Sequence, residues 1–169
     1  MVTKKRSGNT MTRVDITTDY KWGTNLEQEA IDLFEKNAPD GKWLPFTKLG
    51  KFSHFDFCAV DTKRTGKLAF VEVKSRRCER NAYSDTIMPS VKMQKALELI
   101  NLKNKAYLIL NFTDEVCFVD LKDARMSFGY YARTDRGSLE LGHYAFIPLD
   151  QFKTLLKKEK NDSKRSKTN

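Results

Sequence analysis

Apolar side chains recur along parts of the chain at the spacing of an amphipathic helix. Residues 26–34 follow this spacing after Asn25, a good N-cap residue, and Gly41 is expected to end that helix. A second helix with an apolar stripe is expected to begin near Ser90. Asp150 can cap a last short helix that contains apolar residues at the same spacing. The pattern therefore predicts three helices, spread from one end of the chain to the other.

Between these helices, short apolar runs bounded by polar turns indicate strands. The expected strands are Trp43–Thr47, Phe52–Asp61, Lys67–Ser75, Ala106–Phe112, Val116–Leu121, Met126–Arg133 and Ser138–Ile147. The last two are expected to form a hairpin, and a loop is expected from the end of the third strand to Pro89. The order predicts a mixed α/β fold around one sheet, with one domain at residues 14–159.

Charge is distributed unevenly along the 169 residues. The formal net charge is +9, yet residues 14–152 hold twenty basic and twenty acidic side chains. The excess lies in two basic tails without apolar periodicity, residues 1–13 and 160–169, which we expect to be disordered, and in the basic residues that precede the second tail. Cationic tails attract polyanions, although they can also serve only for solubility.

Several classes of protein are disfavoured by what the sequence lacks. The three cysteines, Cys58, Cys78 and Cys117, form no C-x-x-C pair, which argues against a zinc knuckle or a disulfide framework and favours a reducing compartment. The chain begins without an apolar leader, and no apolar run is long enough for a membrane span. The absence of a G-x-x-x-x-G-K-[ST] run indicates that no nucleotide cofactor is used. We therefore expect an intracellular, cytoplasmic protein without a membrane partner, and a phage or mobile-element origin fits these features.

Two neighbouring strands carry the candidate catalytic residues. Side chains alternate along a strand, so Glu72 and Lys74 share one face of Lys67–Ser75. Asp56 lies in the apolar run of the preceding strand, where a lone carboxylate is costly to bury. Hairpin pairing would bring Asp56 and Glu72 together, and two close carboxylates repel unless a proton or cation lies between them. Magnesium prefers such oxygen ligands, and the lysine would then lie beside a metal-bound water.

These residues resemble the signature of the PD-(D/E)xK nuclease superfamily. The aspartate half matches Phe55–Phe57, although Phe55 stands where many members have proline, and the second half matches Phe70–Ser75. The resemblance covers residues 23–121 and implies a restriction-endonuclease-like αβββαβ core with a mixed central sheet flanked by helices. The predicted C-terminal β hairpin and short helix would be additions to this core. The resemblance also implies a Mg²⁺ cofactor, with Mn²⁺ as a substitute.

The resemblance assigns roles residue by residue. Asp56, Glu72 and the carbonyl of Val73 would hold the metal, and Lys74 would position or activate the attacking water. Two further residues are carried over, on the two helices. Glu27 lies in a segment similar to the G-x-x-x-E-x-x-A start of resolvase-like members, and would be an additional metal ligand. The alternative is an ordinary glutamate in the first turn of the helix, where its charge interacts favourably with the helix dipole. Gln94 would complete the catalytic set on the second helix, unless it is an exposed polar residue.

Basic side chains around the motif are candidates for nucleic-acid contacts. They lie after the E-x-K strand, in the turn before it and on the second helix, and a solvated basic surface is the alternative for each. The residues are Arg76, Arg77, Arg80, Lys63, Arg64 and Lys95. Lys95 is also the neighbour that could take the place of Gln94.

The resemblance implies an endonuclease that hydrolyses DNA phosphodiester bonds. Within the superfamily, the short chain favours a branched-DNA or Holliday junction resolvase of DNA recombination, and symmetric cutting favours a homodimer. A sequence-preferring restriction-like or nicking endonuclease is an alternative, with residues 122–149 reading base edges. A non-catalytic DNA- or RNA-binding module with a nuclease fold is a second alternative. A surface ion pair of Glu72 and Lys74 on an unrelated α/β protein is a third.

Overall fold

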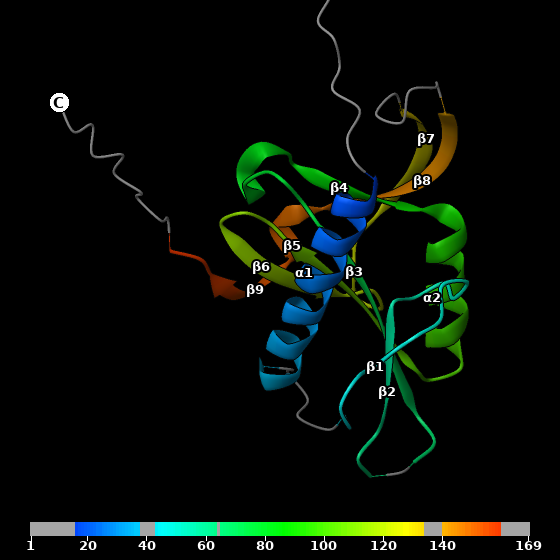
Figure 1. Cartoon of the computed structure of the whole chain (residues 1–169). Coiled ribbons are helices and arrows are strands. Elements are labelled where there is room, and N and C mark those ends of the chain that lie inside the picture. Colours follow the sequence, from blue (N-terminus) through cyan, green and yellow to red (C-terminus); the bar gives the residue numbers. More distant parts are fainter. Residues whose placement is uncertain (1–15, 38–42, 64, 134–139, 160–169) are drawn as a thin grey trace, which may run out of the picture.

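A six-stranded mixed sheet runs through the molecule, with one helix on each of its faces (Figure 1). The computed structural model describes residues 16–37, 43–63, 65–133 and 140–159. In chain order the helices and strands are α1 (Ile16–Asn37), β1 (Thr47–Lys48), β2 (Phe57–Val60), β3 (Leu68–Ser75), a 3-10 turn (Arg80–Ala82), β4 (Asp85–Pro89), α2 (Ser90–Asn101), β5 (Lys105–Asn111), β6 (Glu115–Asp120), β7 (Ser127–Arg133), β8 (Glu140–Pro148), a 3-10 turn (Leu149–Gln151) and β9 (Lys153–Lys157).

The order of strands in the large sheet is β1-β2-β3-β5-β6-β9. Among the strands that the structure describes, only β3 and β5 pair in parallel, and α2 lies in the connection between them. β5 is apolar on both faces because both are covered: Tyr107 and Ile109 pack on the side of α1, and Leu108 and Leu110 on the side of α2. The predicted mixed α/β fold, with a central sheet between helices and an added hairpin, is confirmed.

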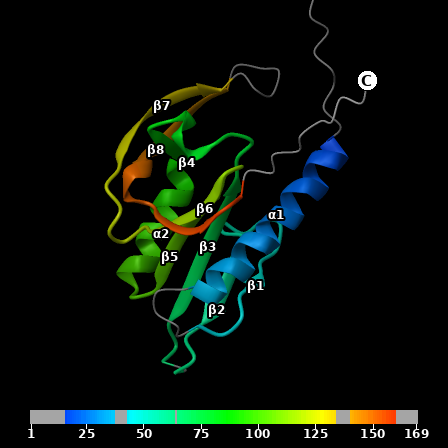
Figure 2. The same cartoon turned by 90° about the vertical axis from the view of Figure 1, so that its left-hand side faces the viewer.

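The two faces of the large sheet carry separate hydrophobic cores. Figure 2 shows α1 on one face of this sheet and α2 on the other. On one face, Phe34 of α1 packs against Tyr107 and Phe118, with ring centroids 5.0 and 5.2 Å apart. On the other face, Met93 and Ala96 of α2 are fully buried. The sheet is thereby fixed from both sides, which holds the ends of its strands in place.

A second sheet of three strands, in the order β4-β8-β7, covers the α2 side of the large sheet. Met88 of β4 pairs with Ala145 of β8, and both are fully buried in the core that α2 shares. The predicted hairpin is confirmed as β7 and β8. The expected loop before Pro89 is wrong for its last part, because β4 forms there by pairing with a strand about 60 residues later in the chain.

Helix α1 begins at Ile16, well before the expected start at Asn25. Asn25 is therefore an exposed residue within the helix rather than its cap. Gly23 and Asn25 are poor helix formers, but each costs only about 1 kcal/mol or less, which packing of the later turns offsets. The basic tails 1–13 and 160–169 and the expected end at Gly41 lie outside the described residues. Neither described helix combines the length and apolar character needed to cross a membrane.

Three other boundaries differ from expectation. The strand expected at Phe52–Asp61 is reduced to β2, and Trp43–Thr47 is reduced to one bridge from Trp43 and the start of β1. The last short helix is wrong beyond its first turn, because β9 pairs with β6 instead. A short apolar run is compatible with the periodicity of a helix or of a strand. This segment forms a strand because the edge of β6 is available for pairing.

Burial of Cys117 leads to a prediction about thiol reactivity. The side chain is fully buried in the α2-side core, and burial raises the pKa of this thiol to about 12, against the opposing effect of Arg80. Because the thiolate is the reactive form, we expect iodoacetamide at pH 8 to modify Cys117 only as fast as the protein unfolds. Mass spectrometry of native and urea-denatured samples measures this, and full native labelling within minutes would contradict the burial.

Candidate active site

The ladder between β2 and β3 sets Asp56 opposite Glu72. Phe57 pairs with Val71 in this antiparallel ladder, and Asp56 immediately precedes the strand. The amide of Asp56 donates to the carbonyl of Val71 over 3.0 Å, so the pairing continues one residue past β2. The carboxylate of Asp56 accepts a bond of 2.8 Å from the amide of Val73. This bond holds the carboxylate against the strand that carries Glu72.

Glu72 is a buried carboxylate in the middle of β3. Only 4% of the residue is exposed, and both of its oxygens accept hydrogen bonds from Nζ of Lys92, at 2.7 and 2.6 Å. Burial, and then the negative charge of Asp56, raise the pKa of Glu72 to about 7, while Lys92 and Lys74 act in the opposite direction. Two carboxylates are thus close enough to influence each other, in a setting where a cation stabilises the pair.

Lys74 lies two residues beyond Glu72 on the same face of β3, as the strand alternation predicts. Its Nζ donates a bond of 2.7 Å to the carbonyl of Ile87 in β4. The half-buried side chain therefore spans from the large sheet to the second sheet. Its ammonium is held near Glu72, which is why its charge contributes to lowering that carboxyl's pKa.

The donor set at this position suits a hard divalent cation. The two carboxylates supply anionic oxygens, and the buried one already has a cation against both of its oxygens, in the form of Lys92. The hydroxyl of Ser75, at the end of β3, is buried without a hydrogen-bond partner in the structure. Among the described residues, no group of three or more His, Cys, Asp or Glu side chains is arranged to hold a metal, so backbone and water oxygens would complete the shell.

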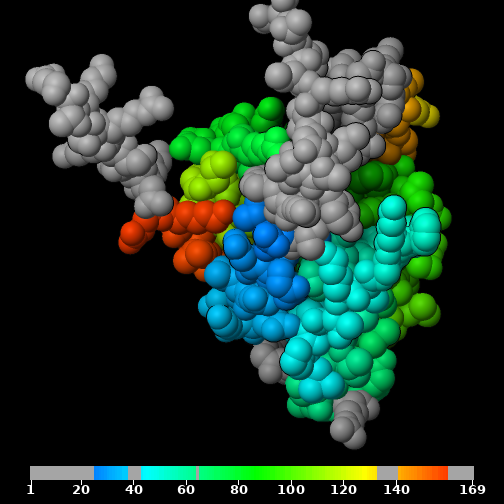
Figure 3. All heavy atoms as spheres, in the orientation of Figure 1, coloured from blue at the N-terminus to red at the C-terminus, as the bar shows by residue number. Residues whose placement is uncertain are grey.

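Glu27 is paired elsewhere in this structure. Its carboxylate accepts a bond of 3.0 Å from Nζ of Lys48, on the strand that neighbours β2. The ammonium of Lys48 also lies 5.8 Å from the ring centre of Phe57, the residue after Asp56. The space-filling view shows the coloured part of α1 next to the segment that carries β1 (Figure 3). The role of Glu27 as an extra metal ligand remains a prediction.

The second helix contributes a different residue from the one expected. Gln94 is exposed on α2, whereas Lys92, two residues earlier, contacts Glu72. Residues two apart on a helix do not face the same way, so both cannot point at the strand. A signal for Lys92 exists in the sequence: a lysine in the first turn of a helix is unfavourable for the dipole and needs a nearby acid. The catalytic role of Gln94 remains untested.

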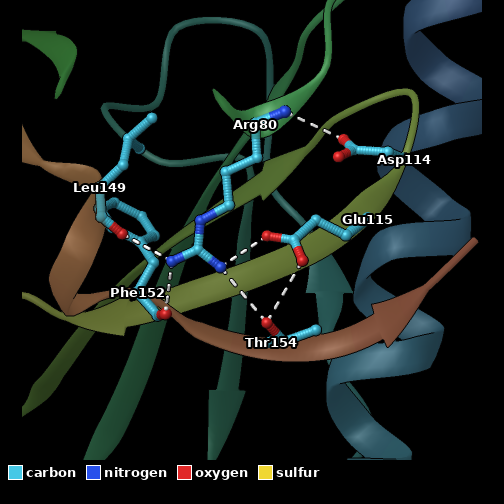
Figure 4. Close-up of polar contacts among 6 residues, drawn as sticks. All are labelled: Arg80, Asp114, Glu115, Leu149, Phe152 and Thr154. Atoms are coloured by element: carbon cyan, nitrogen blue, oxygen red, sulfur yellow. Dashed lines mark hydrogen bonds and ion pairs between the residues drawn. The ribbon is translucent and has the colours of Figure 1, made fainter. Parts of the chain in front are cut away.

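Arg80 has a structural role that its position after the motif did not indicate. Its guanidinium donates to Glu115 and Thr154 and to the carbonyls of Leu149 and Phe152, at 2.5, 3.3, 2.6 and 2.9 Å (Figure 4). Its backbone amide also bonds the carboxylate of Asp114. These contacts join the loop after β3 to β6 and β9. The phosphate contact expected for Arg80 remains a prediction, and it would compete with these bonds within the protein.

The other basic candidates are placed as follows. Arg76 is half-buried and donates to the hydroxyl of Thr86 over 3.2 Å, while Arg77 is exposed next to it. Lys63 is exposed in the turn before β3, and Arg64 lies outside the described residues. Lys95 is half-buried and forms an ion pair of 3.0 Å with Glu98. Arg77 and Lys63 are thus the candidates whose side chains reach solvent most openly.

The fold and the site define a PD-(D/E)xK-type α/β protein. Residues 18–155, more than half of the chain, match the model of a family of phage PDDEXK endonucleases, and the chain belongs to this family. No curated protein matches the chain. Among solved structures, the chain is similar to Hjc, a Holliday junction resolvase from the archaeal hyperthermophile Archaeoglobus fulgidus, with 14% identity and a TM-score of 0.43. That alignment covers 73% of this chain and 86% of the resolvase.

Proposed function

We propose that this protein is a magnesium-dependent endonuclease that hydrolyses phosphodiester bonds in DNA. The observation that carries the proposal is the arrangement of Asp56, buried Glu72 and Lys74 at the β2–β3 ladder, in a member of an endonuclease family. A buried carboxylate beside a second, half-buried carboxylate destabilises the fold, so the presence of Glu72 next to Asp56 requires a role outside packing. This argues against a surface ion pair on an unrelated α/β protein.

The metal would be held by the carboxylates of Asp56 and Glu72 and the carbonyl of Val73. When bound, Mg²⁺ supplies an activated water and neutralises charge on the phosphate. The amide of Val73 keeps one oxygen of Asp56 fixed, which leaves the other oxygen available for the cation. Backbone pairing of β2 and the preceding Asp56 with β3 fixes the main-chain positions of the residues that carry both carboxylates.

Lys74 would position the attacking water and stabilise negative charge that develops on the phosphate. Its ammonium donates a bond to the carbonyl of Ile87. That bond directs the side chain across the face on which Glu72 lies. We expect the family mechanism of direct attack by water, without a covalent intermediate on the protein.

Branched DNA, including Holliday junctions, is the substrate class that we propose first. The described residues form one αβ unit with a small added sheet and no separate recognition domain, which favours recognition of DNA shape over sequence. Symmetric cutting of two strands would require two active sites, and we propose a homodimer for this reason. A role in DNA recombination follows from the same proposal.

The proposal is tested with labelled DNA in linear duplex, single-stranded, flap and four-way forms. We expect the wild type to cut with Mg²⁺ or Mn²⁺, fastest on the four-way junction, and EDTA to abolish the reaction. Asp56→Asn is expected to lose cleavage while it keeps its circular dichroism spectrum, because it preserves the shape of the side chain. Binding of all four DNAs without cleavage by the wild type would support a binding module instead.

A restriction-like or nicking enzyme is a second candidate, favoured by the exposed aromatic side chains of the β7–β8 hairpin. Phe128 is 51% and Tyr130 is 74% exposed, and both lie in the segment expected to read base edges. Cleavage of plasmid DNA at fixed positions, without preference for junctions, would favour this candidate. Replacement of Tyr130 by alanine would then change the sites that are cut.

A further inference from the structure

The contact between Lys92 and Glu72 is the feature of the site that the proposed mechanism does not use. Nζ of Lys92 reaches both oxygens of the carboxylate, at 2.7 and 2.6 Å. The Glu72 side chain is 6% exposed and that of Lys92 is 29% exposed. The ammonium therefore covers the carboxylate from the solvent side and lies where an incoming cation would contact it.

The position of Lys92 in its helix is unfavourable without this contact. It lies in the first turn of α2, and that turn contains no acidic residue. The partial positive charge of a helix N-terminus repels a cation there. Lys95, one turn later, instead pairs with Glu98 of its own helix. The bond to Glu72 thus determines where the ammonium of Lys92 lies.

An ammonium and a divalent cation compete for the same carboxylate oxygens. Magnesium requires ligand distances near 2.1 Å and an octahedral shell, which an ammonium hydrogen-bonded to both oxygens obstructs. Two positive ions on one buried carboxylate would also repel each other strongly. Binding of the metal therefore requires the Lys92 side chain to turn away, which its flexible stem and partial exposure permit.

We propose that Lys92 is the resident counter-ion of Glu72, and that a divalent metal must displace it to enter the site. This rests on the proposed function, because it concerns the same metal site. Before metal arrives, Lys92 holds the buried carboxylate in place through two hydrogen bonds. Lys92 thus acts as a positioning residue that sets the metal concentration at which the site fills.

Metal binding without DNA tests this directly, by calorimetric titration with Mn²⁺ at the same pH for every variant. We expect Lys92→Met to lower the Kd for Mn²⁺ by roughly tenfold, since the competing charge-assisted bonds are gone. Lys92→Arg should raise the Kd, because a guanidinium binds a carboxylate with two parallel bonds. Lys95→Met is the matched control on the same helix and should leave the Kd within about twofold.

The variant Glu72→Gln separates the inference from the proposed function. It should remove Mn²⁺ binding if Glu72 is a ligand, and unchanged binding would overturn the proposed metal site itself. If Glu72→Gln loses binding but Lys92→Met and Lys92→Arg bind like the wild type, only the counter-ion inference is wrong. Thermal melts in EDTA establish that each variant is folded at the titration temperature.

Discussion

Replacing Glu72 by glutamine should reduce the rate of DNA cleavage by about a thousandfold, equivalent to about 4 kcal/mol of transition-state stabilisation. The substitution keeps the shape of the side chain, but it replaces one of the two carboxylates that would hold the metal by a neutral amide. Single-turnover cleavage at saturating Mg²⁺ measures the change. Glu98→Gln is the matched control, since Glu98 is exposed on α2 and pairs with Lys95. Retention of more than a tenth of the wild-type rate would contradict the role of Glu72.

The same substitution should change how stability depends on pH in EDTA. Because the pKa of Glu72 in the folded state is about 7, above the ordinary 4.5, folding favours its protonated form. Its ionisation costs nothing below pH 4.5, and the cost grows until it is complete above pH 7. The wild type should therefore lose about 3 kcal/mol relative to Glu72→Gln across this window. Urea unfolding at pH 4.5, 6 and 8 measures this difference, and a constant difference would contradict it.

Replacing Arg80 by alanine should lower the free energy of unfolding by about 3–5 kcal/mol. The loss leaves the carboxylate of Glu115, which is 7% exposed, without its ion pair, and it removes donors from the carbonyls of Leu149 and Phe152. Urea unfolding at pH 7 measures the change. Arg80→Lys should recover part of the loss, because an ammonium keeps the charge but cannot reach all four acceptors.

Arg125→Ala provides the control for Arg80. Arg125 likewise pairs with a carboxylate, with two bonds to Asp150, but the side chains of this pair are 69% and 68% exposed. An exposed pair of this kind contributes less than about 1 kcal/mol. If Arg80→Ala is as stable as Arg125→Ala but binds DNA more weakly, the phosphate contact expected from the sequence would be supported and the structural role would be wrong.

The centre of the site could be predicted from the sequence because it depends on short-range geometry. Glu72 and Lys74 share a face through strand alternation, and a turn of few residues brings Asp56 beside them. The contacts of Lys92 and Arg80 could not be predicted in the same way. Each depends on how an element packs against a partner 20 to 74 residues away, and the spacing of residues in the sequence does not indicate that packing.

The same reasoning explains which elements were missed. β4 and β9 are short strands whose own residues are weakly patterned, and each forms because an edge of another strand is available. Helix α1 was predicted too short because Gly23 and Asn25 are residues typical of helix ends. Local propensity disfavours them in a helix interior by less than the energy of tertiary packing.

The hairpin of β7 and β8 extends beyond the strand that anchors it. β8 pairs with β4 only as far as Tyr144, opposite Pro89, and from His143 to Glu140 it pairs with β7 alone. The outer part of the hairpin can therefore be lengthened, shortened or exchanged without a shift in the register of β4. The carbonyl of Ile87 that holds Lys74 lies within that register. The length and sequence of the outer hairpin can thus differ between homologous chains while the position of Lys74 is kept.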